Sequence, residues 1–147
     1  MKKIAISACL LGKACRYDGT DNRDDRLLKK LEGAELIPFC PEDFAFGTPR
    51  PTMDLIRTQK GIRAISNETG DDLSEPVISY AVDFFDSYSD IDLFIGKDRS
   101  PSCGVCSAKC YNEQGVLLTA QATGLMAKEA KARGIDTVDA EVYTEVS

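Results

Sequence analysis

Short apolar runs recur along this chain, and their length constrains the fold more than any other feature. Each run is too short for a helix, which needs about ten residues or more, and has the length of a buried strand. The runs cover residues 3–8, 35–39, 91–96 and 138–142. In the last run Val138, Ala140 and Val142 alternate with acidic residues, as in a strand with one buried face.

Longer segments with helical spacing lie between these runs. The clearest helix is expected to begin at Ser74 and to bury one apolar face. A second is expected after Asn22, whose side chain can cap it, and ends at Gly33. A third covers residues 125–133 and is closed by Gly134. Strands that alternate with helices predict an α/β fold with a mainly parallel sheet flanked by helices, a Rossmann-like three-layer arrangement.

Two segments depart from this alternation. Residues 41–53 read PEDFAFGTPRPTM, and their three prolines predict a stiff loop. Residues 55–58 and 62–65 are expected to pair as a hairpin. The whole length of 147 residues is typical of one ordinary domain, so we expect a single domain over residues 1–147.

The composition excludes several classes of protein. A formal net charge of -6 argues against binding of duplex nucleic acid, because a negative surface repels phosphates. The chain has no histidine, which excludes Cys-His and Ser-His catalysis and every His-ligated metal site. A small molecule is therefore the expected partner. Whether the chain acts as a monomer or a homodimer is left open by the sequence.

The sequence MKKIAISACLLG resembles a bacterial lipoprotein cleavage site. Only residues 4–8 separate Lys3 from Cys9, however, whereas a signal sequence needs about 7–15 apolar residues. No other stretch has the length of a membrane span. The cysteines are expected to be reduced, because disulfide scaffolds are usually shorter and poorer in helices and strands. We therefore expect a cytoplasmic protein without a membrane anchor.

Three cysteines follow predicted strands. Cys9 and Cys40 lie at the ends of the first two apolar runs, and Cys103 lies in the loop after the third. In open α/β sheets, ligands bind at the carboxyl ends of the strands, near the point where the strand order reverses. We therefore expect these three thiols to converge at one edge of the sheet.

Closely spaced thiolates need a cation among them, because their like charges otherwise raise one another's pKa. Zinc in a closed structural site takes a fourth ligand. A [4Fe-4S] cluster can be held by three thiolates, which leaves one iron open as a Lewis acid. The remaining thiols, Cys15, Cys106 and Cys110, could be auxiliary ligands, a redox pair or small buried hydrophobes.

Four motifs occur in order along the chain. They are SACLLGKACRYDG at 7–19, PFCPE at 38–42, TPRP at 48–51 and RSPSCG at 99–104. Together they closely resemble the DUF523 family, small bacterial proteins that include thiouracil desulfidases. A weaker similarity continues through GLMAKEAKARGIDTV at 124–138. The chain departs from the family pattern after SPSCG, where it has VCSAKC in place of a glycine-rich stretch without cysteine.

The resemblance implies a cofactor and its ligands. Desulfidases of this family bind a [4Fe-4S] cluster through three cysteines, and the matching positions here are Cys9, Cys40 and Cys103. An iron that is open to solvent is easily lost to oxygen, so protein prepared in air is expected to lack the cluster. The expected reaction is the non-redox hydrolysis of a thiocarbonyl in a small thiolated nucleobase such as thiouracil.

Such a reaction needs a group that moves protons and a polar grip on the substrate. Glu42, two residues after Cys40, is the expected proton carrier, because a desolvated carboxyl has a raised pKa. Ser100 is the second expected catalytic residue. The expected substrate contacts are Arg16, Tyr17, Asp18, Arg50 and Ser102. Arg50 lies between two prolines and could present a rigid fork to an anionic group.

Two other functions remain open from the residues alone. One is a non-catalytic metal-binding module in which zinc is held by Cys103, Cys106, Cys110 and one distant thiol. The other is a sulfur carrier that uses exposed thiols. Loss of the metal on substitution of Cys40 would favour the cluster enzyme, whereas dependence on Cys106 and Cys110 would favour the zinc module.

Overall fold

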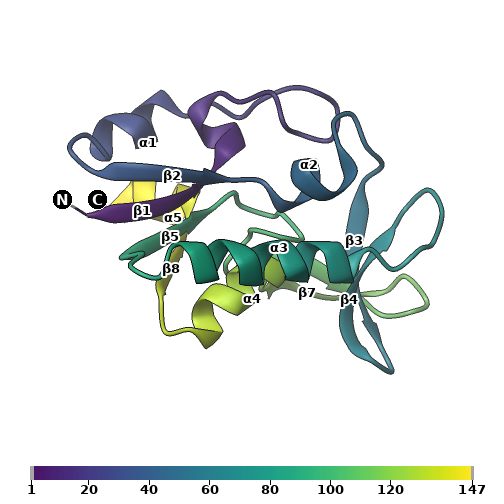
Figure 1. The fold of residues 1–147 in the computed structure, drawn as a ribbon. Coiled ribbons are helices and arrows are strands. Elements are labelled where there is room, and N and C mark those ends of the chain that lie inside the picture. Colours follow the sequence, from purple (N-terminus) through teal and green to yellow (C-terminus); the bar gives the residue numbers. More distant parts are fainter. Residues whose placement is uncertain (1, 147) are drawn as a thin grey trace.

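The structure, a computed structural model, describes residues 2–146, which form two four-stranded sheets with helices packed on them (Figure 1). The strands are β1 (Lys3–Ser7), β2 (Glu35–Phe39), β3 (Met53–Thr58), β4 (Gly61–Ser66), β5 (Leu93–Gly96), β6 (Ala108–Tyr111), β7 (Leu117–Ala122) and β8 (Asp136–Asp139). The helices are the 3-10 helix η1 (Ala8–Leu11), α1 (Asp25–Lys30), α2 (Pro41–Phe46), α3 (Ser74–Ser87), α4 (Leu125–Ala132) and α5 (Ala140–Val146). Within residues 2–146, no helix combines the length and hydrophobicity that a membrane span requires.

The first sheet, in the order β2-β1-β5-β8, is parallel throughout. Ala5 of β1 lies opposite Ile37 of β2 on one side and Phe94 of β5 on the other. The chain thus moves from β1 to β2 in one direction and later places β5 on the opposite side of β1. The strand order therefore reverses at β1, which is where α/β sheets open a ligand crevice. The predicted parallel α/β sheet is confirmed.

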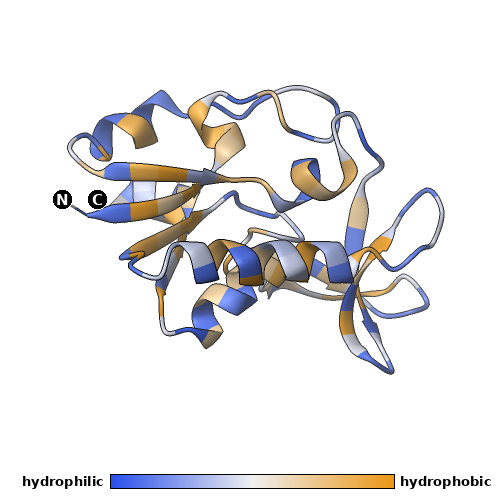
Figure 2. Ribbon diagram, in the orientation of Figure 1, coloured by the Kyte–Doolittle hydropathy of each residue, from blue (hydrophilic) through white to orange (hydrophobic). Residues whose placement is uncertain are grey.

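Alternate residues of β1 face opposite sides of this sheet. Ala5 packs with Phe85 of α3 and Met126 of α4 in one core. Ile4 and Ile6 belong to a second core on the other face, formed with α1, η1 and α5. In Figure 2 the strands of this sheet are largely hydrophobic, while the outer turns of α1 and α3 carry hydrophilic residues. Helices on both faces bury the apolar strands that the sequence predicts.

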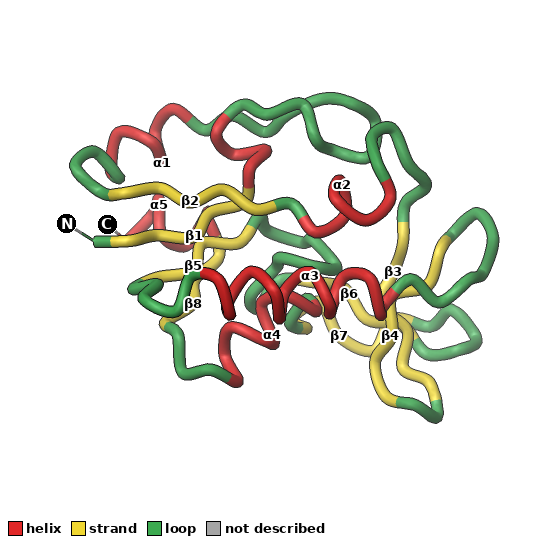
Figure 3. Tube along the Cα trace, viewed as in Figure 1, coloured by secondary structure: helices red, strands yellow, loops and turns green. Residues whose placement is uncertain are grey.

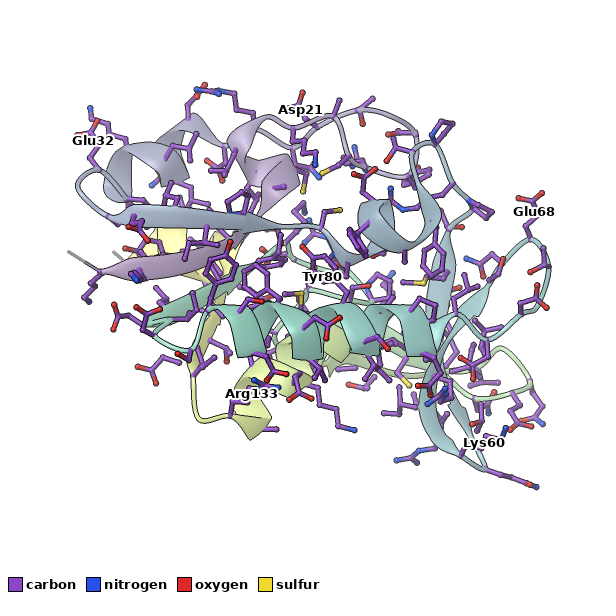
Figure 4. All side chains as sticks on the ribbon, viewed as in Figure 1. Asp21, Glu32, Lys60, Glu68, Tyr80 and Arg133 are labelled. Carbon is purple, nitrogen blue, oxygen red and sulfur yellow. The ribbon has the colours of Figure 1, made fainter. Side chains whose placement is uncertain are left out.

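The second sheet, in the order β4-β3-β6-β7, mixes parallel and antiparallel pairs. The predicted hairpin is confirmed as β3 and β4, with Asp54 opposite Ile65. Lys60, labelled in Figure 4, lies in the turn of this hairpin. β3 also pairs in parallel with β6, and β6 pairs antiparallel with β7. The sequence predicted the hairpin but not the sheet that it belongs to.

Two local predictions near the site were wrong. Helix α1, for which the sequence predicts Asn22 as the cap, is capped by Asp24. The Asp24 carboxylate accepts a hydrogen bond of 3.0 Å from the Leu27 amide. Residues 41–53 are not a single loop, since α2 begins at Pro41. Proline at the first helical position loses no hydrogen bond, because that amide has no partner within the helix.

The last predicted strand was wrong in its second half. β8 ends at Asp139, and Ala140 begins a helix. The amide of Glu141, in the first turn of this helix, donates to the carboxylate of Asp98 at 2.9 Å. This partner lies in the loop after β5, so local periodicity could not reveal it.

Candidate functional site

A cavity of about 500 Å³ opens at the carboxyl ends of β1, β2 and β5. The segments directly after these strands line it, together with the loops at 12–24 and 47–52. The two loops lie side by side, since the Arg50 amide donates to the Tyr17 carbonyl oxygen at 2.8 Å (Figure 3). The cavity therefore occupies the crevice that the strand reversal at β1 leaves open.

The cavity brings together Cys9, Cys40 and Cys103. Each follows a different strand of the parallel sheet, and those three strands are neighbours in the order β2-β1-β5. Cys15, from the loop after η1, lines the same cavity. All of these thiols are free, with no disulfide among the described residues.

Cys9 lies in η1, directly after β1, and is half-buried. The loop that follows folds back on it, so that Asn22 contacts it twice. The Asn22 amide donates to the Cys9 carbonyl oxygen at 2.9 Å, and the Asn22 side chain donates from Nδ2 to Cys9 Sγ at 3.6 Å. Burial raises the pKa of the Cys9 thiol, and the hydrogen bond from Asn22 opposes that rise.

Cys40 stands between β2 and α2, where its extended backbone caps the helix. Its amide donates to the Tyr80 hydroxyl at 3.2 Å. In Figure 4, Tyr80 projects from α3 towards the segment that joins β2 to α2. The Cys40 thiol points to the neighbouring loop, with Sγ 3.8 Å from the carbonyl oxygen of Cys15.

Cys103 is buried in the loop between β5 and β6. Its amide donates to Ser100 Oγ at 3.0 Å, and the carbonyl oxygen of the preceding Ser102 accepts the amide of Met126 in α4. Burial raises the pKa of the Cys103 thiol well above its ordinary value, and the nearby charges of Glu42 and Cys40 add to this. A thiol in such a position becomes an anion only when a cation compensates its charge.

Cys15 is also buried at the cavity wall. Burial, followed by the influence of Cys40, raises the pKa of the Cys15 thiol to about 12. Cys106 and Cys110, in contrast, do not line this cavity. Cys106 is exposed with Sγ near the Gln121 carbonyl oxygen, and Cys110 is buried in the core of the second sheet. The two cysteines that follow Cys103 in the sequence therefore lie outside the lining of this cavity.

Glu42, in the first turn of α2, is the carboxylate closest to these thiols in sequence and lines the cavity. Its side chain is 16% exposed. The Ser102 hydroxyl donates to Glu42 Oε2 at 2.9 Å, and Arg50 Nε lies 3.7 Å from Oε1. Burial raises the pKa of Glu42, although the Arg50 charge and the hydrogen bond from Ser102 oppose the rise.

Arg50 lines the cavity, and its guanidinium is held in the cavity wall by two main-chain oxygens and the Thr48 hydroxyl. Its side chain is 6% exposed. Nη2 donates to the Cys15 carbonyl oxygen at 2.8 Å, and Nη1 donates to Gly47 O at 3.1 Å and to Thr48 Oγ1 at 2.9 Å. Nε alone has no hydrogen-bond partner among the described residues. The guanidinium thus ties the loop at Cys15 to the end of α2.

The other predicted site residues divide into two groups. Arg16, Tyr17 and Ser100 line the cavity, whereas Asp18 and Ser102 do not. The Asp18 carboxylate accepts the amide and the hydroxyl of Thr20 at an exposed turn. Ser102 is fully buried behind Glu42. Both side chains therefore lie outside the lining of the cavity.

The thiols do not converge tightly on one point. Within residues 2–146, no three Cys, Asp or Glu side chains form a group that could hold a single metal ion. A single zinc ion takes its thiolates at about 2.3 Å, so its ligands must lie close together. A zinc site made from Cys103, Cys106 and Cys110 is therefore not preformed.

A family model described as 2-thiouracil desulfurase matches residues 4–141. The chain belongs to this family.

Two known proteins are similar to this desulfurase-family chain over most of its length. The uncharacterized protein YbbK of Bacillus subtilis (strain 168) is 30% identical in an alignment of 117 positions, which covers 74% of this chain and 76% of YbbK. A solved structure of the [4Fe-4S]-dependent thiouracil desulfidase TudS (DUF523Vcz) is 28% identical and superposes with a TM-score of 0.75. The match covers 99% of this chain and 95% of TudS. The resemblance to the DUF523 family that the motifs indicated is confirmed.

The sequence did not single out several residues that line the cavity of this desulfurase-family member. The sequence predicts Asn22 as a helix cap and makes no prediction for Lys97 and Asp98, yet all three line the cavity. Lys97 and Asp98 follow β5 directly, so the strand-end rule that selected the cysteines applies to them too. Nothing in the local pattern around Asn22 indicates that it turns back to Cys9.

Proposed function

We propose that this protein hydrolyses the thiocarbonyl of a small thiolated nucleobase, such as thiouracil, at a [4Fe-4S] cluster held by Cys9, Cys40 and Cys103. One observation carries the proposal: these thiols follow three neighbouring parallel strands and line one cavity with Glu42. In the overall reaction, water supplies the oxygen that replaces sulfur, and hydrogen sulfide leaves. No electron donor is needed.

The residues at the cavity fit such a cluster. Thiolates are the usual ligands of iron–sulfur clusters, and each binds a different iron, so the ligands surround a space instead of meeting at one atom. Separate thiols around a cavity of about 500 Å³ match that requirement. When bound through three thiolates, a cluster supplies an open iron that acts as a Lewis acid towards a soft thiocarbonyl sulfur.

Glu42 is the proposed proton carrier. Its carboxylate is held on one oxygen by Ser102, while Oε1 faces the buried Arg50 at 3.7 Å. Burial raises the pKa of Glu42. A carboxylate with a raised pKa is a stronger base and can accept a proton from the attacking water. Ser102, expected from the sequence to bind substrate, serves here to orient Glu42.

Ser100 is the proposed second polar group at the reacting centre. Its oxygen accepts the amides of Ser102 at 3.2 Å and Cys103 at 3.0 Å, and its hydroxyl proton can be donated to the Glu42 carboxylate or to a group in the cavity. Ser100 lines the cavity, which lets this proton reach a substrate atom or the attacking water.

Arg16 and Tyr17 are the proposed contacts to the heterocycle. Both line the cavity, and the Arg16 guanidinium lies 5.7 Å from the Tyr17 ring centroid. The role proposed for Arg50 differs from the substrate contact that the sequence predicts. Because its fork binds main-chain oxygens, it orders the cavity wall instead of recognising an anion. With six free cysteines, such a protein is suited to the reducing cytoplasm.

The test is turnover by the anaerobically reconstituted protein. Incubation with 2-thiouracil, without reductant, is expected to remove the thiocarbonyl absorbance and to release uracil and sulfide in equal amounts. Protein freed of iron by a chelator under the same conditions is the control and is expected to be inactive. An intact cluster that converts none of a series of thiolated pyrimidines and purines would contradict the proposal.

A further inference from the structure

Asn22 makes a side-chain contact with Cys9 that the capping of a helix does not explain. Its side chain points from the loop after η1 into the cavity, where Nδ2 lies 3.6 Å from Cys9 Sγ. Helix α1 begins at Asp25 and is capped by Asp24, so the side-chain amide of Asn22 does not cap this helix. A side-chain amide directed at sulfur is a weak hydrogen bond to a neutral thiol and a stronger one to a thiolate.

The backbone fixes this contact. The Asn22 N–H donates to the Cys9 carbonyl oxygen at 2.9 Å, and the next-but-one amide, of Asp24, donates to the Leu10 carbonyl oxygen at 3.1 Å. The segment therefore runs back along η1 and carries the Asn22 side chain to the sulfur. Any residue except proline at position 22 can retain the main-chain bond, so the contribution of the side chain can be measured separately.

We infer that Asn22 is a positioning residue that donates a hydrogen bond to the Cys9 thiolate when this sulfur binds a metal cluster. The inference rests on the proposed function, in which Cys9 is a cluster ligand. Hydrogen bonds to cluster sulfurs set the reduction potential, and partners outside the ligand shell hold the ligands in orientation. Here the N–H dipole stabilises negative charge on Sγ, and it stabilises the reduced cluster most because that state carries more negative charge.

Asn22→Leu removes the donor with little change in shape or charge. We expect the reconstituted Asn22→Leu protein to lose iron to a chelator about tenfold faster than wild type. Its cluster is also expected to have a more negative midpoint potential, which a purely structural role would not alter. Asn22→Asp, which cannot donate and adds a negative charge at the sulfur, is expected to shift the potential further in the same direction.

Asn112→Asp is the matched control for charge. Asn112 lies in the turn between β6 and β7, where its side-chain oxygen accepts the amides of Gln114 and Val116, a part that aspartate retains. This variant is expected to match wild type in iron loss and potential. Circular dichroism spectra that coincide with that of wild type would show that the position 22 variants are folded. If Asn22→Leu does not fold, the iron loss and the potential are measured on Asn22→Asp.

The outcomes separate the two proposals. Wild-type protein that takes up a cluster, with both position 22 variants unchanged in iron loss and potential, overturns the part assigned to Asn22 and leaves the proposed function intact. Wild-type protein that takes up no cluster overturns both.

Discussion

The hydroxyl of Ser102 donates a hydrogen bond of 2.9 Å to Oε2 of Glu42, although the two residues are 60 positions apart in the sequence. The contact joins the loop that carries Cys103 to the helix that begins after Cys40. The proposed proton carrier is thereby held relative to two of the proposed ligands.

Glu42→Gln removes the group that accepts a proton but retains an oxygen for the Ser102 hydroxyl. We expect kcat for the loss of sulfur from 2-thiouracil to fall at least about 100-fold, the lower end of the usual contribution of acid–base catalysis. Iron content is expected to equal that of wild type. Glu32→Gln, at an exposed residue just after α1, is the control. A Glu42→Gln protein within threefold of wild-type kcat would show that Glu42 carries no proton in the reaction.

Ser102→Ala leaves Oε2 of Glu42 without its donor. Because Ser102 is fully buried and bonds a carboxylate, we expect the free energy of unfolding to fall by about 1–3 kcal/mol. We also expect kcat to fall about tenfold, less than in Glu42→Gln, since a misplaced base still works in part. Steady-state kinetics and urea unfolding test both, with Ser79→Ala at an exposed position of α3 as the control. Wild-type kcat in Ser102→Ala would contradict the proposal that Ser102 orients Glu42.

Gly96 ends β5 where the Cys103 loop returns across it. A Cβ at this position would lie 1.7 Å from the Cys103 carbonyl oxygen, so the loop must shift or the strand must break. We expect Gly96→Ala to lower the free energy of unfolding by about 3 kcal/mol or more. Gly33→Ala, whose Cβ meets nothing within 4 Å but whose φ is +87°, should cost only the backbone strain of about 1–2 kcal/mol. Equal losses in the two variants would argue against the close approach at Gly96.

Asp72 makes the stability depend on pH in the acid range. Partial burial would raise its pKa, but hydrogen bonds from Ser74 and Arg63 outweigh this and lower the pKa to about 2. A carboxyl whose pKa is lower in the folded state stabilises the protein above its ordinary pKa of 3.8, and this contribution is lost as pH falls from about 4 to about 2. Because the side chain is 36% exposed, we expect the contribution to be at most about 1 kcal/mol.

Asp72→Asn tests this dependence. The variant is expected to be less stable than wild type at pH 6, and the difference is expected to shrink near pH 2, as measured by urea unfolding at each pH. A difference between the two proteins that persists unchanged at pH 2 would show that the carboxylate charge is not its source.

The cysteine positions could be predicted because the rule behind them is local. A residue directly after a parallel strand lies at the carboxyl edge of its sheet, whichever strands lie beside it. Cys9 and Cys40 meet this condition from their own short segments. The directions of side chains in loops are not local in this way. Asp18 turns back to Thr20, and Arg50 binds the Cys15 carbonyl oxygen through a contact between separate loops.

The second sheet could not be predicted for a related reason. The hairpin of β3 and β4 leaves a local signal, since its strands are joined by a short turn. The pairing of β3 with β6 places Leu55 opposite Cys110. The local sequence of neither strand indicates that it pairs with the other. This pairing buries Cys110 and so removes it from the group of candidate ligands.

The iron content of single cysteine variants tests the central claim most directly. Wild type, Cys40→Ala and Cys106→Ala would be reconstituted anaerobically and assayed for iron and acid-labile sulfide per chain. We expect about four of each in wild type and in Cys106→Ala, as a [4Fe-4S] cluster requires, and a large loss of both in Cys40→Ala. A Cys40→Ala protein that keeps its full iron and sulfide, or a Cys106→Ala protein that loses them, would contradict a cluster bound at the ends of β1, β2 and β5.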